Sequence, residues 1–300
     1  MKPKTLILVL LAVLFAAPAG SLAKVKVVAS TSDLESIAEF IGGDLVEAEA
    51  IVNGKKDPHF VEVLPSYMVK VGRADVYLKV GGDLDYWADR IIDGSQNAGL
   101  LIVDCSRNVE FLEKPTTKID ASMGDIHRQG NPHYWLDPAN GAIIAETIAA
   151  SLSRVDPENG AAYEKGLAAF RSTLESKREE WRKIAEPIRG MEIITYHNSW
   201  PYFAHAFGIE IVGFVEPQPG IEPTPSHTAQ LISMIRARKI KIIGKEPYFS
   251  PRTPESIARQ TSASVVELPP SVGGAEDAKD YFALFDALLG RLLDSLGGEK

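Results

Sequence analysis

A metal site in this sequence must use its six histidines and its carboxylates, because a single cysteine, Cys105, allows no internal disulfide and no thiolate cluster. Three of them share a context: His59 and His197 each follow a predicted strand, and His133 lies on a loop just before a predicted helix. In parallel α/β sheets, ligands bind outside the carboxyl ends of the strands, so these side chains could meet in one cleft. Imidazole suits Zn²⁺ and the late first-row metals. The sequence therefore indicates a site of histidines and carboxylates, although a surface or core role remains open for each histidine taken alone.

The other three histidines have weaker contexts. His127 lies in a polar segment without clear periodicity, residues 113–131, where we expect an exposed loop histidine. A transient role in handing over a metal is the alternative for His127. His205 is expected inside a short helix and His227 at the start of another, and we expect neither of them to be a ligand.

Length and composition describe a globular protein with a secretion signal. The chain has 300 residues, 45% of them hydrophobic and 24% charged. Residues 1–23 combine two lysines, an apolar run too short to span a bilayer and a small-residue cleavage site, as in a signal peptide. Removing these two lysines changes the net charge from −8 to −10, which disfavours nucleic acid as a partner. Because no cysteine lies near the cleavage site, we expect a periplasmic protein without a lipid anchor.

The elements that must position the histidines alternate between strand and helix. This alternation predicts an α/β fold with two lobes, each a mostly parallel sheet flanked by helices. We expect the lobes at residues 24–136 and 190–300, joined by a long rigid helix over 137–189 that begins at the Asp137-Pro138 cap and restarts at Asp156-Pro157. Strands are expected at 25–30, 46–52, 76–80, 100–103, 192–196, 210–215, 240–244 and 264–268. Helices are expected at 33–41, with Asp33 as the cap, and at 65–71, 87–92, 202–207, 228–238, 254–261 and 277–296.

Four segments resemble the metal-binding solute-binding proteins of ABC transporters that take up zinc and manganese. Asp57-Pro58-His59-Phe60-Val61-Glu62-Val63-Leu64-Pro65-Ser66 is similar to the family's D-P-H-x-Y-E-x-x-P-S segment. The stretch 131–138, N-P-H-Y-W-L-D-P, is similar to its D-P-H-x-W-L-D-P. The stretches 195–203 and 222–225 are similar to its H-x-x-x-x-Y-F segment and its E-P-S loop. The resemblance covers essentially the whole chain after residue 23. It implies that His59, His133 and His197 are metal ligands and that a long helix joins the two lobes.

The sequence departs from the family pattern at the fourth ligand. The family supplies an Asp after its last strand, where this chain has Pro269. Three alternatives remain: Glu246, which ends a neighbouring predicted strand and which we favour, Glu267, or a water molecule. Glu246 could equally be a carboxylate bonded to backbone N–H groups or to an arginine. Three imidazoles favour Zn²⁺ over Mn²⁺, which prefers oxygen donors.

The function that fits these features is capture of a divalent transition metal, Zn²⁺ first, by a monomer that delivers it to the membrane permease of an ABC importer. A Mn²⁺- or Fe²⁺-binding protein of the same class is the alternative. A secreted zinc metallohydrolase is the rival from another class, because catalytic zinc keeps an open water position. No H-E-x-x-H or nucleophile-elbow motif is present, so we do not expect an enzyme.

Overall fold

Short segments rich in valine and other apolar residues form the first sheet, in the N-terminal lobe. The computed structural model describes residues 24–116 and 127–297. The strands are β1 (Val25–Thr31), β2 (Val46–Val52), β3 (Val76–Lys79) and β4 (Leu101–Asp104). They pair in parallel in the order β2-β1-β3-β4, so their carboxyl ends share one edge. That edge faces the second lobe.

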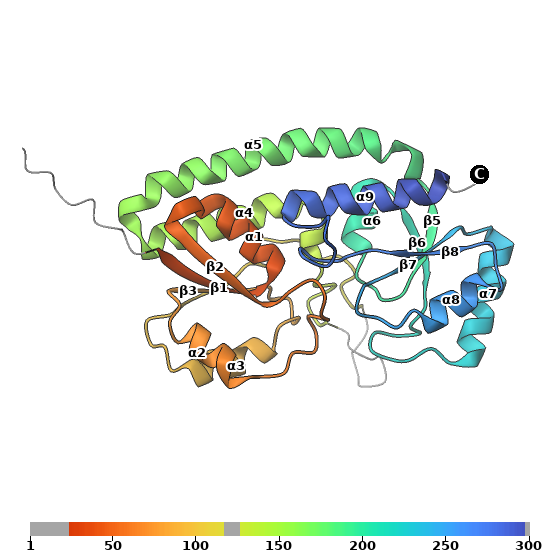
Figure 1. Ribbon diagram of the computed structural model, residues 1–300, viewed down its shortest axis with the longest axis horizontal. Coiled ribbons are helices and arrows are strands. Elements are labelled where there is room, and N and C mark those ends of the chain that lie inside the picture. The colour runs from red at the N-terminus through yellow and green to blue at the C-terminus, as the bar shows by residue number, and fades with distance from the viewer. Residues whose placement is uncertain (1–23, 117–126, 298–300) are drawn as a thin grey trace, which may run out of the picture.

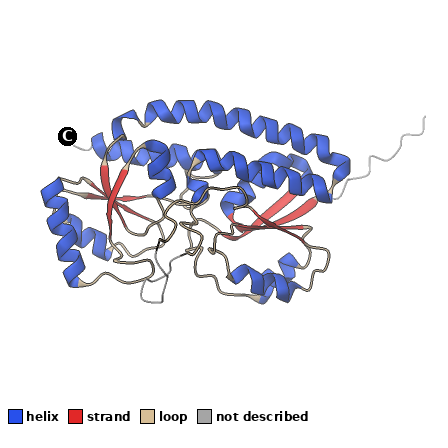
Figure 2. Ribbon diagram, turned by 180° about the vertical axis from the view of Figure 1, so that it is seen from behind, coloured by secondary structure: helices blue, strands red, loops and turns tan. Residues whose placement is uncertain are grey.

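The second sheet repeats this arrangement. Its strands are β5 (Glu192–Thr195), β6 (Glu210–Phe214), β7 (Ile242–Lys245) and β8 (Ser264–Glu267). All pairs are parallel and the order β6-β5-β7-β8 matches that of the first sheet strand for strand. Figure 2 shows the two sheets side by side, with helices over both faces of each. The predicted fold class, two parallel α/β lobes, is confirmed.

The helices that flank the sheets follow the predicted order with small differences at their ends. In the first lobe they are α1 (Ser32–Gly42), α2 (Pro65–Val71) and α3 (Trp87–Ser95). In the second they are α6 (Pro201–Phe207), α7 (Pro225–Arg238), α8 (Arg252–Ala258) and the closing α9 (Tyr281–Gly297). The N-cap residue of α1 is Thr31, and not Asp33, because the helix already begins at Ser32. The buried Asp33 carboxylate instead accepts a hydrogen bond from the Val272 backbone N–H at 3.0 Å.

The segment expected as one linking helix contains two. Helix α4 (Pro138–Val155) ends at Asp156, and α5 (Gly160–Ile184) begins after a short 3₁₀ turn at Pro157–Asn159. The break is stabilised by the Asp156 carboxylate, which accepts hydrogen bonds from Asn159 and Tyr163 at 2.8 and 2.7 Å. Helix α4 packs against the first lobe, and α5 runs along both lobes (Figure 1). The 25 residues of α5 give a rod of about 37 Å at 1.5 Å per residue.

A second connection returns from the second lobe to the first. After β8 the chain passes residues 269–274, where the Val272 carbonyl accepts from Ser32 Oγ at 2.6 Å and from the Gly54 N–H at 3.1 Å. Helix α9 then lies beneath α5 (Figure 1), and its Tyr281 hydroxyl donates to the Trp135 carbonyl at 2.7 Å. One continuous apolar core therefore runs through both lobes and the helices above them.

Within the described residues, no helix is long and apolar enough to cross a membrane. The predicted signal peptide, residues 1–23, and residues 117–126 of the polar segment before His133 lie outside the described residues.

Candidate metal centre

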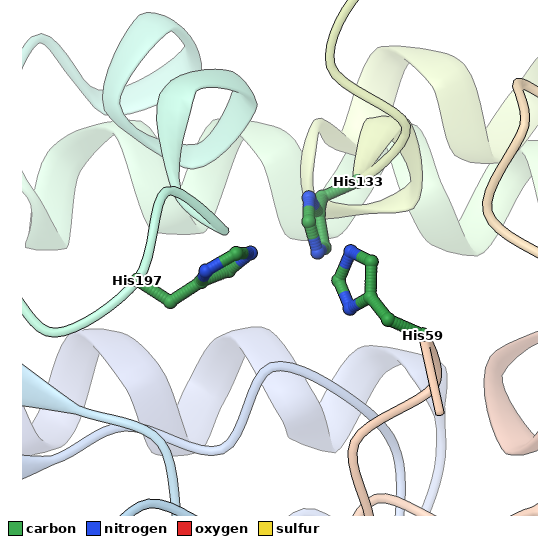
Figure 3. A group of neighbouring side chains, drawn as sticks. All are labelled: His59, His133 and His197. Carbon is green, nitrogen blue, oxygen red and sulfur yellow. The ribbon is translucent and has the colours of Figure 1, made fainter. Parts of the chain in front are cut away.

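The three predicted histidines meet between the lobes, and each comes from a different part of the chain (Figure 3). His59 lies on the loop after β2, His197 lies two residues after β5, and His133 directly precedes the 3₁₀ turn Tyr134–Leu136. One nitrogen of each ring lies within 4.8 Å of the other two. The ring centroids are 5.1 to 5.6 Å apart. Nitrogens at such separations can share one ion at bond lengths near 2 Å after small side-chain adjustments.

The Nδ1 atom of each ring is held by an oxygen of the chain. His59 Nδ1 lies 2.7 Å from Asp57 Oδ1, His133 Nδ1 lies 3.0 Å from Asn131 Oδ1, and His197 Nδ1 lies 2.8 Å from Glu216 Oε2. An oxygen acceptor fixes the hydrogen on Nδ1 and leaves the lone pair on Nε2. The Nε2 atoms of His59 and His133 are buried and have no hydrogen-bond partner among the described residues. Such nitrogens are suited to bind a metal ion.

Two of these holding contacts come from the same local motif. In Asp57-Pro58-His59 and in Asn131-Pro132-His133, the Asx side chain accepts both the backbone N–H and the Nδ1 of the histidine two residues later. The proline between them restricts the backbone, so the tripeptide orients its own imidazole. The same Asx-Pro-His pattern therefore stands in the sequence before both rings.

Burial and neighbouring charges give the rings different pKa values. Burial lowers the pKa of His133 well below its ordinary value, and the three neighbouring imidazoles lower it further. Burial also acts to lower the pKa of His197, but the hydrogen bond to Glu216 and the charge of Glu246 outweigh it, so the pKa of His197 is raised. His133 is therefore neutral and ready to bind a metal ion at pH 7, whereas protons compete for His197.

Glu246 lies immediately after β7 and is fully buried. Its Oε1 accepts hydrogen bonds from Ser199 Oγ and Trp200 Nε1 at 2.8 and 2.9 Å, while Oε2 has no partner among the described residues. Burial raises its pKa to about 7, and the charge of His197 partly offsets this. No oxygen of Glu246 belongs to the described group of atoms that lie within 4.8 Å of one another. Its role as the fourth ligand stays a prediction.

The remaining candidates are placed as follows. Glu267 is half-exposed and pairs with Lys245 Nζ at 3.2 Å. The ring of His127 lies 5.3 Å from that of His59, closer to the site than an exposed loop position suggests. His205 is exposed on α6, and the imidazole of His227 lies 2.9 Å from the Phe214 carbonyl. Asp137 caps α4 through the Ala139 N–H at 2.8 Å, as expected.

Sequence reasoning missed Glu216. It lies two residues after β6, is buried, and holds His197 across 19 positions of sequence. No local pattern marks it among 40 acidic residues. The available signal was its place after the strand that neighbours β5, which requires knowing the strand order.

A cavity of about 550 Å³ opens beside the site. His133, His197 and Glu216 contribute to its wall, together with Asn131, Asn198 and His127. Polar groups and imidazoles converge on this space from both lobes, so an ion could reach the rings from this side.

The arrangement described so far defines a class, the solute-binding proteins that bind metal ions for ABC transporters. The chain belongs to the family described as "Zinc-uptake complex component A periplasmic" (ZnuA), whose profile matches residues 27–294. This confirms the resemblance seen in the motifs. It is a family of solute-binding transport proteins.

Individual relatives agree on the class and differ in the metal that they name. The manganese ABC transporter substrate-binding lipoprotein PsaA of Streptococcus pneumoniae is 26% identical over 289 residues, which cover 91% of this chain and 89% of PsaA. The metal ABC transporter substrate-binding lipoprotein FimA of Streptococcus parasanguinis is 29% identical over 259 residues, which cover 82% of this chain and 80% of FimA. A crystal structure of ZnuA matches with a TM-score of 0.78 at 28% identity, covering 90% of this chain and 98% of that one.

These relatives contradict the predicted localisation. PsaA and FimA are named lipoproteins, so the expectation of a periplasmic protein without a lipid anchor is wrong by comparison with them. The expectation depended on the absence of a cysteine near the predicted cleavage site, within a segment outside the described residues. The sole cysteine, Cys105, is buried in the first lobe.

Proposed function

We propose that this protein captures Zn²⁺ between its lobes and delivers it to the membrane permease of an ABC importer. The ligands are the Nε2 atoms of His59, His133 and His197, with the Oε2 atom of Glu246 as the fourth. The ion is cargo, and the protein contributes binding and release.

The observation that carries this proposal is the orientation of the three imidazole rings. Each Nδ1 is held by an oxygen of the chain, and one nitrogen of each of the three rings lies within 4.8 Å of the others. A histidine that only packs in a core has no need to present a buried, unpartnered nitrogen to two others. The arrangement matches the way that ligand imidazoles are oriented in metal sites.

The choice of zinc follows from the donor set. Three imidazole nitrogens and one carboxylate oxygen suit a four-coordinate zinc site, whereas manganese favours more oxygen donors. Two carboxylates that could supply oxygen, Asp57 and Glu216, are engaged by imidazole Nδ1 atoms. Mn²⁺ is the second candidate, because the relative PsaA is named for manganese.

Calorimetric titration of the metal-free protein with Zn²⁺ and Mn²⁺ tests the proposal. We expect one ion per chain. Because Zn²⁺ binds more tightly than Mn²⁺ at almost any site of nitrogen and oxygen donors, the metal content of protein purified from its native periplasm decides between the two ions, and we expect zinc. His59→Ala and His197→Ala should each weaken binding by more than the roughly 10- to 100-fold typical of losing the hydrogen-bond partner of a ligand. His205→Ala, on an exposed ring outside the site, is the matched control and should bind as the wild type does. Unchanged affinity in the His59 and His197 variants would refute the site, and manganese in the natively purified protein would make Mn²⁺ the cargo instead of Zn²⁺.

A further inference from the structure

Asn131 contacts two of the three histidine segments through opposite atoms of one amide group. Its Oδ1 atom accepts the backbone N–H of His133 at 3.1 Å and lies 3.0 Å from His133 Nδ1. Its Nδ2 atom donates to the backbone carbonyl of Asn198 at 2.8 Å. Asn198 directly follows His197, so the amide spans the space between the two ligand-bearing segments.

Glu113 completes the contact on the nitrogen side. Its Oε2 atom accepts from Asn131 Nδ2 at 3.2 Å and from Asn198 Nδ2 at 2.7 Å. Glu113 lies on the loop after β4 of the first lobe, and Asn198 follows β5 of the second. Three parts of the chain are thus joined at a single amide beside the metal site.

The backbone of Asn131 is held as well. Its N–H donates to the Leu112 carbonyl at 2.9 Å, and its carbonyl accepts from the Tyr202 hydroxyl at 2.8 Å. The side chain is buried, with 8% of the residue exposed. A buried amide with every polar atom engaged has one orientation, because turning it over would set oxygen against oxygen at Asn198.

We infer that Asn131 is a positioning residue that fixes the distance between the imidazoles of His133 and His197 by tying their segments together across the lobes. This inference rests on the proposed function. By contrast, His59 is oriented by Asp57 on its own loop, which has no corresponding tie to His133 or His197 among the contacts described. His133 and His197 therefore form a prearranged pair, and His59 is positioned separately.

An aspartate at this position separates the two contacts of the amide. Asn131→Asp keeps an oxygen that accepts from His133, so the imidazole retains its orientation. The variant loses the donor to Asn198 and places a carboxylate against the Asn198 carbonyl and the Glu113 carboxylate. Its added negative charge by itself favours binding of a cation, so any loss of affinity occurs against that attraction.

The partner substitution should restore part of the tie, the part that runs through residue 113, while the introduced carboxylate still faces the Asn198 carbonyl. In Asn131→Asp combined with Glu113→Gln, the introduced glutamine amide can donate to the introduced carboxylate while its oxygen still accepts from Asn198. The direction of the hydrogen bond between positions 131 and 113 is reversed, and the net charge returns to that of the wild type. Glu113→Gln alone is the control for the loss of the Glu113 charge.

The experiment measures Zn²⁺ affinity by calorimetry and the His133 tautomer by ¹⁵N NMR in the metal-free protein. We expect N131D to lose roughly 10- to 100-fold in affinity, with Nδ1 of His133 still protonated, and the double variant to recover part of the loss. Wild-type affinity in N131D would overturn the inference. A weakened N131D in which Nδ1 of His133 is no longer protonated would overturn it too, since the loss would then come from a changed His133 ring and not from the broken tie. If N131D fails to fold, the Zn²⁺ affinity of the double variant is compared with that of E113Q. Weaker binding by the double variant supports the inference, and equal binding overturns it. Failure of the wild type to bind metal, or of His59→Ala to weaken binding, would instead refute the proposed function.

Discussion

Replacing Glu246 by glutamine should make the metal-free protein more stable at alkaline pH and should lower its affinity for Zn²⁺. Glutamine has the shape of a protonated carboxyl and keeps an oxygen that accepts from Ser199 and Trp200. It removes the negative charge that burial disfavours. In the proposed site, however, the negative charge of Glu246 stabilises the bound dication, so the glutamine variant should bind zinc more weakly.

The size of the gain follows from the pKa of Glu246, which burial raises from 4.5 to about 7. Because the pKa is higher in the folded protein than in the unfolded chain, stability falls as the pH rises from about 4.5 to about 7 and is constant above that. At about 1.4 kcal/mol per pKa unit, this shift corresponds to a cost of at most ~3.5 kcal/mol. Glu246→Gln should recover this amount at pH 8 and almost none at pH 4.5.

Urea unfolding at pH 5 and pH 8, with a chelator present, measures both differences. A gain at pH 8 that largely disappears at pH 5 supports the reasoning. Equal effects at the two pH values would refute it, because the change would then reflect packing and not charge. With zinc in excess, the order should reverse, since the wild type gains more binding free energy from the ion than the variant does.

Two further predictions concern proton competition and the packing of the linking helix. Glu216 and Glu246 outweigh the effect of burial and raise the pKa of His197. As the pH is lowered, zinc affinity should therefore begin to fall while the pH is still above 6.5, because protons compete for this ring. Competition with a coloured chelator measures this trend, and an affinity that stays constant down to pH 6 would contradict it. Gly166→Ala on α5 would set its Cβ atom 2.1 Å from the Ile41 carbonyl and should destabilise the protein by about 1–3 kcal/mol in urea unfolding. Gly290→Ala on α9 is the matched control, because its Cβ atom meets nothing within 4 Å, and it should be neutral or stabilise by about 0.5–1 kcal/mol.

Much of the fold could be predicted because local chemistry decides it. The expected bounds of strand 46–52 and of helix 65–71 match β2 and α2, since β-branched residues stand at both ends of the strand and a proline occupies the first helical position. The path of the chain after Asp156 could not be predicted. The Asp156-Pro157 pair predicts a break in the helix. The direction of α5 after this break depends on packing, including the close approach of Gly166 to α1.

In the metal site, too, some contacts could be predicted from the sequence and others could not. His59 and His133 are oriented by Asx side chains two positions earlier, a relation that the sequence contains. His197 depends on Glu216, and the link between them exists only because β5 and β6 are neighbours in the sheet. Contacts within a few residues leave a pattern in the sequence, and contacts made by parallel pairing leave none that a single chain reveals.

The return of the chain after β8 has a consequence for the order of assembly. Val272 and Tyr281 are bonded to Asp33 and Ser36 at the start of the first helix, so the lobe that leaves the ribosome first lacks part of its covering until the last residues arrive. The first lobe therefore makes these contacts only after residues 272–281 have been added. Chains that stop short of residue 281 should remain incompletely folded in both lobes, and exposure of the nascent protein to proteases should persist until translation is complete.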